Sequence, residues 1–281
     1  MQSVTFNPNP FLLFNMKHFR KDSPPRYLFR VHAPLSAGES SANAVLSPAA
    51  LYAHPEQMDD LFALAPSDAA KLLKDHLYWK CNDRCNLMRW TTSHGLRRHQ
   101  TDRLCPAFAD IFLLMIDTRD FQKRTFIKDL EGRSVQVSFQ TLIDLGLFVL
   151  FPPLAVEAEW EKLARRVVEL RQPFYRREIC ITTPDEVRTA VQLARDGFGG
   201  RWTFPVAVML LALKARANND QVIIEGFEAE FSEDEIRELS LLDIQVDRDR
   251  LPELAQFENL GNDIHRHFTG RDINSVFWRV R

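Results

Sequence analysis

FADIFLLMIDT, residues 108–118, is the stretch that decides the fold of the first half of this chain. The run is almost continuously apolar, and it is bounded by Cys105-Pro106 before it and by polar residues after it. A short apolar run between turn residues is typical of a strand buried on both faces. We therefore predict that the first half is built on a small sheet.

Two more stretches have the pattern of strands. Residues 26–32 (RYLFRVH) are rich in β-forming side chains and stop before Pro34, and residues 133–139 (RSVQVSF) alternate apolar and polar positions. The alternation places Arg30 on the same strand face as its polar neighbour His32. The polar stretch 35–47 is a predicted loop, and Ser67 is the predicted N-cap of a helix.

The second half has helical periodicity. Helices are predicted at 156–170, 184–197, 203–217 and 246–257, and a capping box predicts that another begins at Ser232. Residues 221–231 could be a strand or a loop. Phe151-Pro-Pro-Leu154 is the clearest break in the chain. We predict a tail or arm at 1–25, an α+β domain at 26–154, and a mainly helical region at 155–281 that is either separate or packed with the first as one body. The predicted fold class is α+β, with a small mixed sheet and surrounding helices in the N-terminal half.

Composition narrows the class of protein. The chain has 281 residues, 36 basic against 38 acidic side chains, and a net charge of −2, which argues against a dedicated nucleic-acid binder. Four cysteines are too few for a disulfide scaffold, and no run is long and apolar enough for a membrane helix. We expect a cytoplasmic or nuclear protein that is not secreted and does not bind a membrane.

Residues 76–105 concentrate potential ligands and cations. A zinc site could draw on His76, Cys81, Cys85, His94, His99 and Cys105. No C-x-x-C knuckle is present, so buried free thiols are the simpler interpretation. The segment also has six basic residues against two acidic ones, with Tyr78, Trp79 and Trp90 among them. Stacking on nucleic-acid bases is one explanation, and a solvated basic face with core tryptophans is the favoured one.

Three short motifs in the first half of the chain resemble those of known protein families and indicate a function. Leu28-Phe29-Arg30-Val31, then Arg89-Trp-Thr-Thr-Ser93, then the apolar strand that ends in Asp117-Thr118, resembles an uncharacterised domain of filamentous fungi. The order also resembles the arginine, hydroxyl-run and glutamate plan of ADP-ribosyltransferases. The resemblance implies that Arg30, Thr91, Thr92 and Ser93 bind NAD. It also implies that Glu159, in Glu157-Ala-Glu159, is the catalytic carboxylate.

A second class of function fits the same sequence. A non-catalytic interaction protein would use its aromatic-rich first half and helical second half to bind a protein partner, whose identity the sequence does not indicate. The two classes differ in what they require of Arg30. An NAD site needs its guanidinium beside Thr92 and a glutamate, whereas a structural arginine is satisfied within the fold.

Overall fold

The structure is a computed structural model, and it describes residues 26–34, 36–52, 64–77, 85, 88, 107–121, 130–155, 160–232, 235–236 and 251–269. The chain divides into two compact units, 1–139 and 140–281. The first contains strands and short helices, and the regular elements described in the second are all helices joined by loops. The predicted α+β class is confirmed. The Phe151–Leu154 break lies within the second unit, where Pro152–Leu154 forms the 3-10 helix η5.

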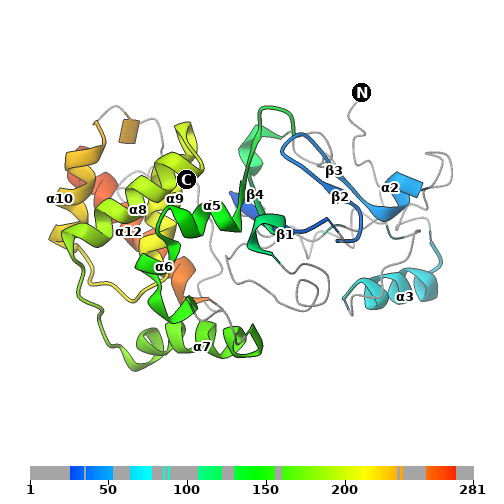
Figure 1. Cartoon of the computed structure of the whole chain (residues 1–281), viewed down its shortest axis with the longest axis horizontal. Helices are drawn as coiled ribbons and strands as arrows, with labels where there is room; N and C mark the ends of the chain where they lie inside the picture. Colours follow the sequence, from blue (N-terminus) through cyan, green and yellow to red (C-terminus); the bar gives the residue numbers. More distant parts are fainter. Residues whose placement is uncertain are drawn as a thin grey trace, which may run out of the picture. The chain divides into compact units, whose positions relative to one another are not determined.

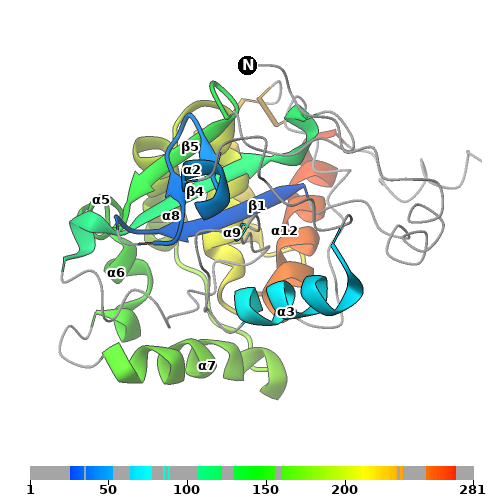
Figure 2. The same ribbon diagram turned by 90° about the vertical axis from the view of Figure 1, so that its right-hand side faces the viewer.

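The first unit is organised by a three-stranded sheet. It contains β1 (Tyr27–His32), β4 (Phe112–Asp117) and β5 (Ser134–Ser138), with β4 in the centre. Both pairings are antiparallel, in place of the mixed sheet expected, and Figure 2 shows the three strands together. All three predicted strands are present. The central one begins at Phe112 because residues 108–110 form the 3-10 helix η3.

A small hairpin lies in the stretch that was predicted to be a loop. It pairs β2 (Glu39–Ser40) with β3 (Val45–Leu46). Gly38 precedes it with φ +78°, and a Cβ there would lie 2.3 Å from the carbonyl oxygen of Leu46. Glycine is therefore the residue that this close approach requires. The loop prediction was wrong here because two-residue strands leave no periodicity to detect.

Short helices follow the hairpin in the first unit. Helix α2 is Pro48–Tyr52, and α3 is Pro66–Leu77. Ser67 is the second residue of α3, so the prediction that it is the N-cap was wrong by a margin that is common at helix ends. Beside the sheet, Val45, Leu114, Ile116 and Leu130 form a buried apolar cluster. The hairpin and the central strand therefore share one core.

The second unit packs helices around one that is wholly buried. Every residue of α9 (Thr203–Ala212) is buried, and α8 and α12 pack directly on it. Figure 1 shows these helices together with α10, which packs on α8. The other described elements are α5 (Phe139–Asp144), α6 (Leu147–Leu150), α7 (Trp160–Arg176), α8 (Pro184–Gly197), η6 (Gly200–Trp202), α10 (Gln221–Glu230) and α12 (Pro252–Thr269).

The start of α8 confirms a sequence prediction, and helix α10 corrects another. Helix α8 covers 184–197, as predicted, and Thr183 caps it by accepting a hydrogen bond from the Glu186 backbone N–H, with Pro184 at the first helical position. Residues 221–230 are helical, so the strand-or-loop prediction was wrong. The Asp220 side chain accepts from the first backbone N–H groups of α10, and this cap outweighs the β-branched residues that follow.

The last helix also differs from the prediction, because it begins at Pro252 and continues to Thr269. Residues 246–250, the tail at 1–25 and the C-terminal segment 270–281 lie outside the described residues. No helix in the described part of the chain is both long enough and apolar enough to cross a membrane.

Candidate functional site

Arg30, the predicted NAD-binding arginine, is engaged within the first unit. It lies on β1 and is buried, with an exposed fraction of 8%. Its Nε donates to Ser40 Oγ at 2.7 Å, and its Nη2 lies 3.5 Å from the Ala37 carbonyl oxygen. The guanidinium thus fastens the β2–β3 hairpin to the sheet. This is the structural role for a buried arginine on a strand, since burial requires its donors to be satisfied.

His32 lies on the same sheet face, two residues further along β1. Its ring stacks on Phe112, with centroids 5.5 Å apart. Burial, together with the positive charge of Arg30, lowers the pKa of His32 to about 4, against a smaller opposing effect of a hydrogen bond with Gln136. Its Nε2 atom is buried, and no described residue forms a hydrogen bond with it. His32 is therefore a neutral ring at physiological pH.

The other predicted NAD and catalytic residues lie outside the described residues. These are Thr91, Thr92, Ser93 and Glu159. The structure thus places Arg30 alone of the set, and the predicted NAD site stays a prediction.

The segment 76–105 is described only at its start and at two isolated positions. His76 Nδ1 lies 3.3 Å from Cys85 Sγ, and Cys85 is buried. Cys81, His94, His99 and Cys105 lie outside the described residues. Among the residues that are described, no group of three histidine, cysteine or acidic side chains could hold a metal ion. Zinc or nucleic-acid binding by 76–105 stays a prediction.

The second unit contains a buried polar cluster that the sequence did not reveal. Arg216 lies at its centre, with a side chain only 1% exposed. Its Nη2 is 2.7 Å from Glu186 Oε1, and its Nη1 donates to Thr182 Oγ1 at 3.1 Å. Lys214 Nζ also reaches Glu186 Oε1, at 2.5 Å. Burial alone raises the pKa of Glu186, but the hydrogen bonds from Arg216 and Lys214 outweigh it and lower that pKa.

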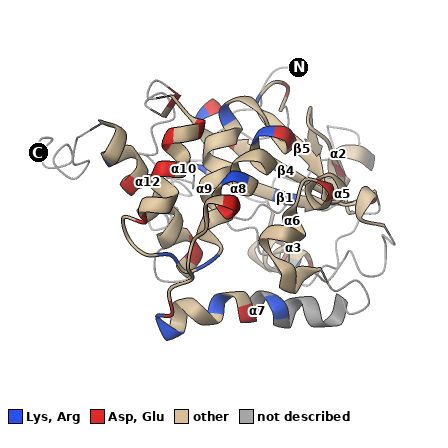
Figure 3. Ribbon diagram, turned by 60° about the vertical axis from the view of Figure 1, so that its left-hand side comes forward, with Lys and Arg blue, Asp and Glu red and all other residues tan. Residues whose placement is uncertain are grey.

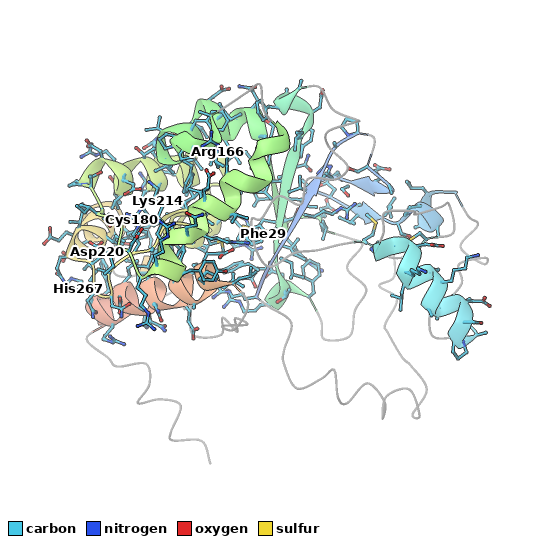
Figure 4. The ribbon with its side chains drawn as sticks, turned by 90° about the horizontal axis from the view of Figure 1, so that it is seen from below. Phe29, Arg166, Cys180, Lys214, Asp220 and His267 are labelled. Carbon is cyan, nitrogen blue, oxygen red and sulfur yellow. The ribbon has the colours of Figure 1, made fainter. Side chains whose placement is uncertain are left out.

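This cluster holds the segment 178–183, which connects α7 to α8. Thr182 Oγ1 also donates to Asp220 Oδ2 at 2.5 Å. The Cys180 backbone N–H donates to the Ala215 carbonyl oxygen at 2.8 Å. Figure 4 shows Cys180, Lys214 and Asp220 near one another in this unit. Segment 178–183 is therefore fixed on its inner side by both side-chain and backbone hydrogen bonds.

The outer side of segment 178–183 is apolar and open. Ile179 is 62% exposed and Ile181 is 88% exposed, whereas Thr182 is 7% exposed. Exposure that alternates from one residue to the next is the pattern of an extended strand with one buried face. Isoleucine is among the residues most often buried in folded proteins, so two that project from a fixed backbone need an explanation.

A third exposed apolar side chain comes four residues before Ile179 in the sequence. Tyr175, in the last turn of the helix, is 70% exposed. The helix then ends in a Schellman arrangement, because the Glu178 N–H donates to the Pro173 carbonyl and the Arg177 N–H donates to that of Phe174. Arg177 takes the left-handed position with φ +56°, where glycine is usual. We call Tyr175, Ile179 and Ile181 the 175–181 surface.

One sequence pattern indicates this surface. The stretch 178–183 (EICITT) alternates isoleucine with smaller residues, as a strand would, although it lies between two helices. Comparisons with protein-family models, with curated proteins and with solved structures gave no match. The class that the structure defines is α+β.

Proposed function

We propose that this protein is a non-catalytic interaction protein that binds a protein partner through the 175–181 surface. The observation that carries the proposal is the outward projection of Ile179 and Ile181 from a backbone fixed on its other side. A mobile loop could turn such side chains away from water. This one is held by the Cys180 and Thr182 hydrogen bonds, so the isoleucines stay in solvent until something covers them.

The energetics favour a partner. Complete burial of an isoleucine side chain is worth about 1.5–3 kcal/mol. Single exposed apolar residues are ordinary on any protein, but clustered ones mark interaction sites. Tyr175 adds an aromatic side chain of the kind enriched at the centres of protein interfaces.

A comparison of variants tests the proposal. Tagged wild-type protein and the triple variant Tyr175→Ser, Ile179→Thr, Ile181→Thr are purified from cells in which the protein is expressed, and bound proteins are quantified by mass spectrometry. Threonine keeps the β-branched backbone preference while it removes apolar surface. We expect at least one protein to co-purify with the wild type and to be lost from the variant.

The matched control is Leu73→Thr, which alters an exposed apolar residue of α3 in the first unit. Its bound proteins should equal those of the wild type. Equal sets for all three proteins, with unfolding midpoints also equal, would refute a role for the 175–181 surface.

NAD binding is the alternative proposal, and it rests on the resemblance to ADP-ribosyltransferases. Thermal unfolding with and without millimolar NAD separates the two, because a ligand that binds only the folded state raises its apparent stability. The interaction proposal expects no rise, since Arg30 already donates to Ser40 and Ala37. A rise that Arg30→Gln abolishes would favour NAD, and a nicotinamide-release assay on Glu159→Gln would then test catalysis.

A further inference from the structure

Among the described residues, the one backbone hydrogen bond made by residues 179–182 runs from the Cys180 N–H to the Ala215 carbonyl oxygen. In an extended strand the N–H and C=O groups of successive residues point to opposite sides. Cys180 directs its N–H to Ala215, so Ile179 and Ile181 direct theirs the other way. Within the part of the chain that the structure describes, neither isoleucine has a backbone hydrogen bond. Residues 178–183 belong to no strand of either sheet, and the backbone groups of Ile179 and Ile181 are unpaired among the described residues, beside two exposed apolar side chains.

We propose that these unpaired backbone groups form an edge that binds an extended peptide of the partner as an added β-strand. The inference rests on the proposed function and specifies how that surface is used. The peptide would exchange backbone hydrogen bonds with Ile179 and Ile181, and its alternate side chains would pack on the two isoleucines as cross-strand neighbours. An unpaired edge is a template for such pairing, and exposed β-branched residues make it a favourable one.

The basic residues at the end of α7 indicate that the bound peptide has an acidic residue at one end. Residues 171–178 contain Arg171, Arg176 and Arg177 against the single acidic residue Glu178. Figure 3 shows the basic end of α7 from which segment 178–183 continues. Arg171 is paired with Glu253, and Arg176 lies 4.0 Å from Glu178. Arg177 has no ion pair among the described residues, so the matching peptide has an acidic residue beside it.

A second copy of the chain is a poorer occupant. Pairing of two 178–183 segments would bring a second basic α7 end to the interface, and like charges suppress association. An apolar peptide with an acidic end satisfies both the open edge and Arg177. Self-association therefore becomes an outcome that the experiment distinguishes.

The experiment starts from a phage-displayed library of random decapeptides selected on the full-length protein. The best binder is synthesised with a fluorophore, and its affinity is measured by anisotropy for the wild type, for Ile179→Thr with Ile181→Thr, and for Leu73→Thr. Two modified peptides carry N-methyl groups on alternate amides, one on the odd positions and one on the even positions. A strand presents only one of these two sets to the edge that it joins.

We expect an alternating apolar peptide with an acidic end, whose affinity falls at least about tenfold in the double threonine variant and is unchanged in Leu73→Thr. Only one of the N-methylated peptides should bind at least about tenfold more weakly, because each methyl group removes a backbone donor. That difference between the two peptides is specific to strand pairing.

Other outcomes separate this inference from the proposed function. Binding that depends on the isoleucines but falls equally for both N-methylated peptides, or for neither, overturns strand pairing and leaves the interaction surface intact. If no selected peptide depends on Ile179 and Ile181, the peptide-binding edge is overturned, while the co-purification comparison still decides the proposed function. A dimer in sedimentation that Ile181→Thr dissociates would replace the peptide with a second copy.

Discussion

The two units differ in the side chains that they expose. The first turns polar groups inward, where Arg30 and His32 lie buried beside a small hairpin. The second buries the whole of α9 and fixes a polar cluster around Arg216, yet it turns Ile179 and Ile181 outward. Buried polar groups are explained by partners within the fold. Exposed isoleucines on a fixed backbone have no such explanation among the described residues of their unit, and this contrast points to an external partner.

The contrast between buried polar groups and exposed isoleucines requires that the Arg216 cluster holds segment 178–183 in place. Arg216→Met removes the charge but keeps most of the side-chain volume, and it leaves Glu186 buried with Lys214 as its remaining cation. Loss of one member of a buried ion pair costs about 3–5 kcal/mol. Urea unfolding should show a decrease of that order in the free energy of unfolding, the largest effect expected here.

Arg188→Met is the matched control for that substitution. Arg188 pairs with Asp185 on the same helix as Glu186, but both partners are exposed. An exposed pair is worth less than about 1 kcal/mol. Similar losses in the two variants would mean that the Arg216 cluster does not hold the segment and that the isoleucines are not fixed in solvent.

A smaller effect is expected from pH in the first unit. The pKa of His32 is about 4 in the folded protein, below the value of about 6.5 for an unperturbed histidine. As pH falls through this window, the unfolded chain binds a proton before the folded one does. Stability from the neutral ring is therefore complete above about pH 6.5 and is lost toward pH 4, by about 1–3 kcal/mol.

Unfolding measured at about pH 7.5 and at about pH 4.5 checks this prediction. The acid-induced loss should be smaller in His32→Gln than in the wild type, since glutamine has no charge to gain. His267→Gln, at a half-exposed position on α12, serves as the control and should lose as much as the wild type. An equal loss in all three proteins would show that burial of the His32 ring does not control acid stability.

Periodicity made much of this fold predictable. The alternation in β1 and β5, the apolar run of β4, and the Thr183-Pro184 start of α8 are local signals, and each marks its element. Helix α10 was missed because its Val222 and β-branched neighbours suggest a strand, while the deciding cap is one side chain, that of Asp220.

The candidate site was harder to predict because long-range contacts define it. Arg30 was singled out as a ligand-binding residue, but its partner Ser40 belongs to a hairpin with no sequence period. Cys180 bonds to Ala215 and Thr182 bonds to Arg216 on the side of the segment away from Ile181, and both partners lie more than thirty residues away in the sequence. A local pattern gives the alternation of 178–183, and only the fold decides which face meets solvent.

The smallest predicted change in the free energy of unfolding is that of Arg177→Gly. It tests whether Arg177 is retained for partner binding although its backbone conformation destabilises the fold. Its left-handed backbone is unfavourable for a residue with a Cβ, so Arg177→Gly should raise the free energy of unfolding by about 0.5–1 kcal/mol. Asn219→Gly is the control, because Asn219 has φ +51° but asparagine tolerates that region, and its gain should be a few tenths of a kcal/mol at most. Arg177→Gly should also weaken binding of an acid-ended peptide, whereas Asn219→Gly should not. A variant that is more stable and binds equally well would show that Arg177 has no role in recognition, and the charge argument for the partner would then fail while the isoleucine edge remained.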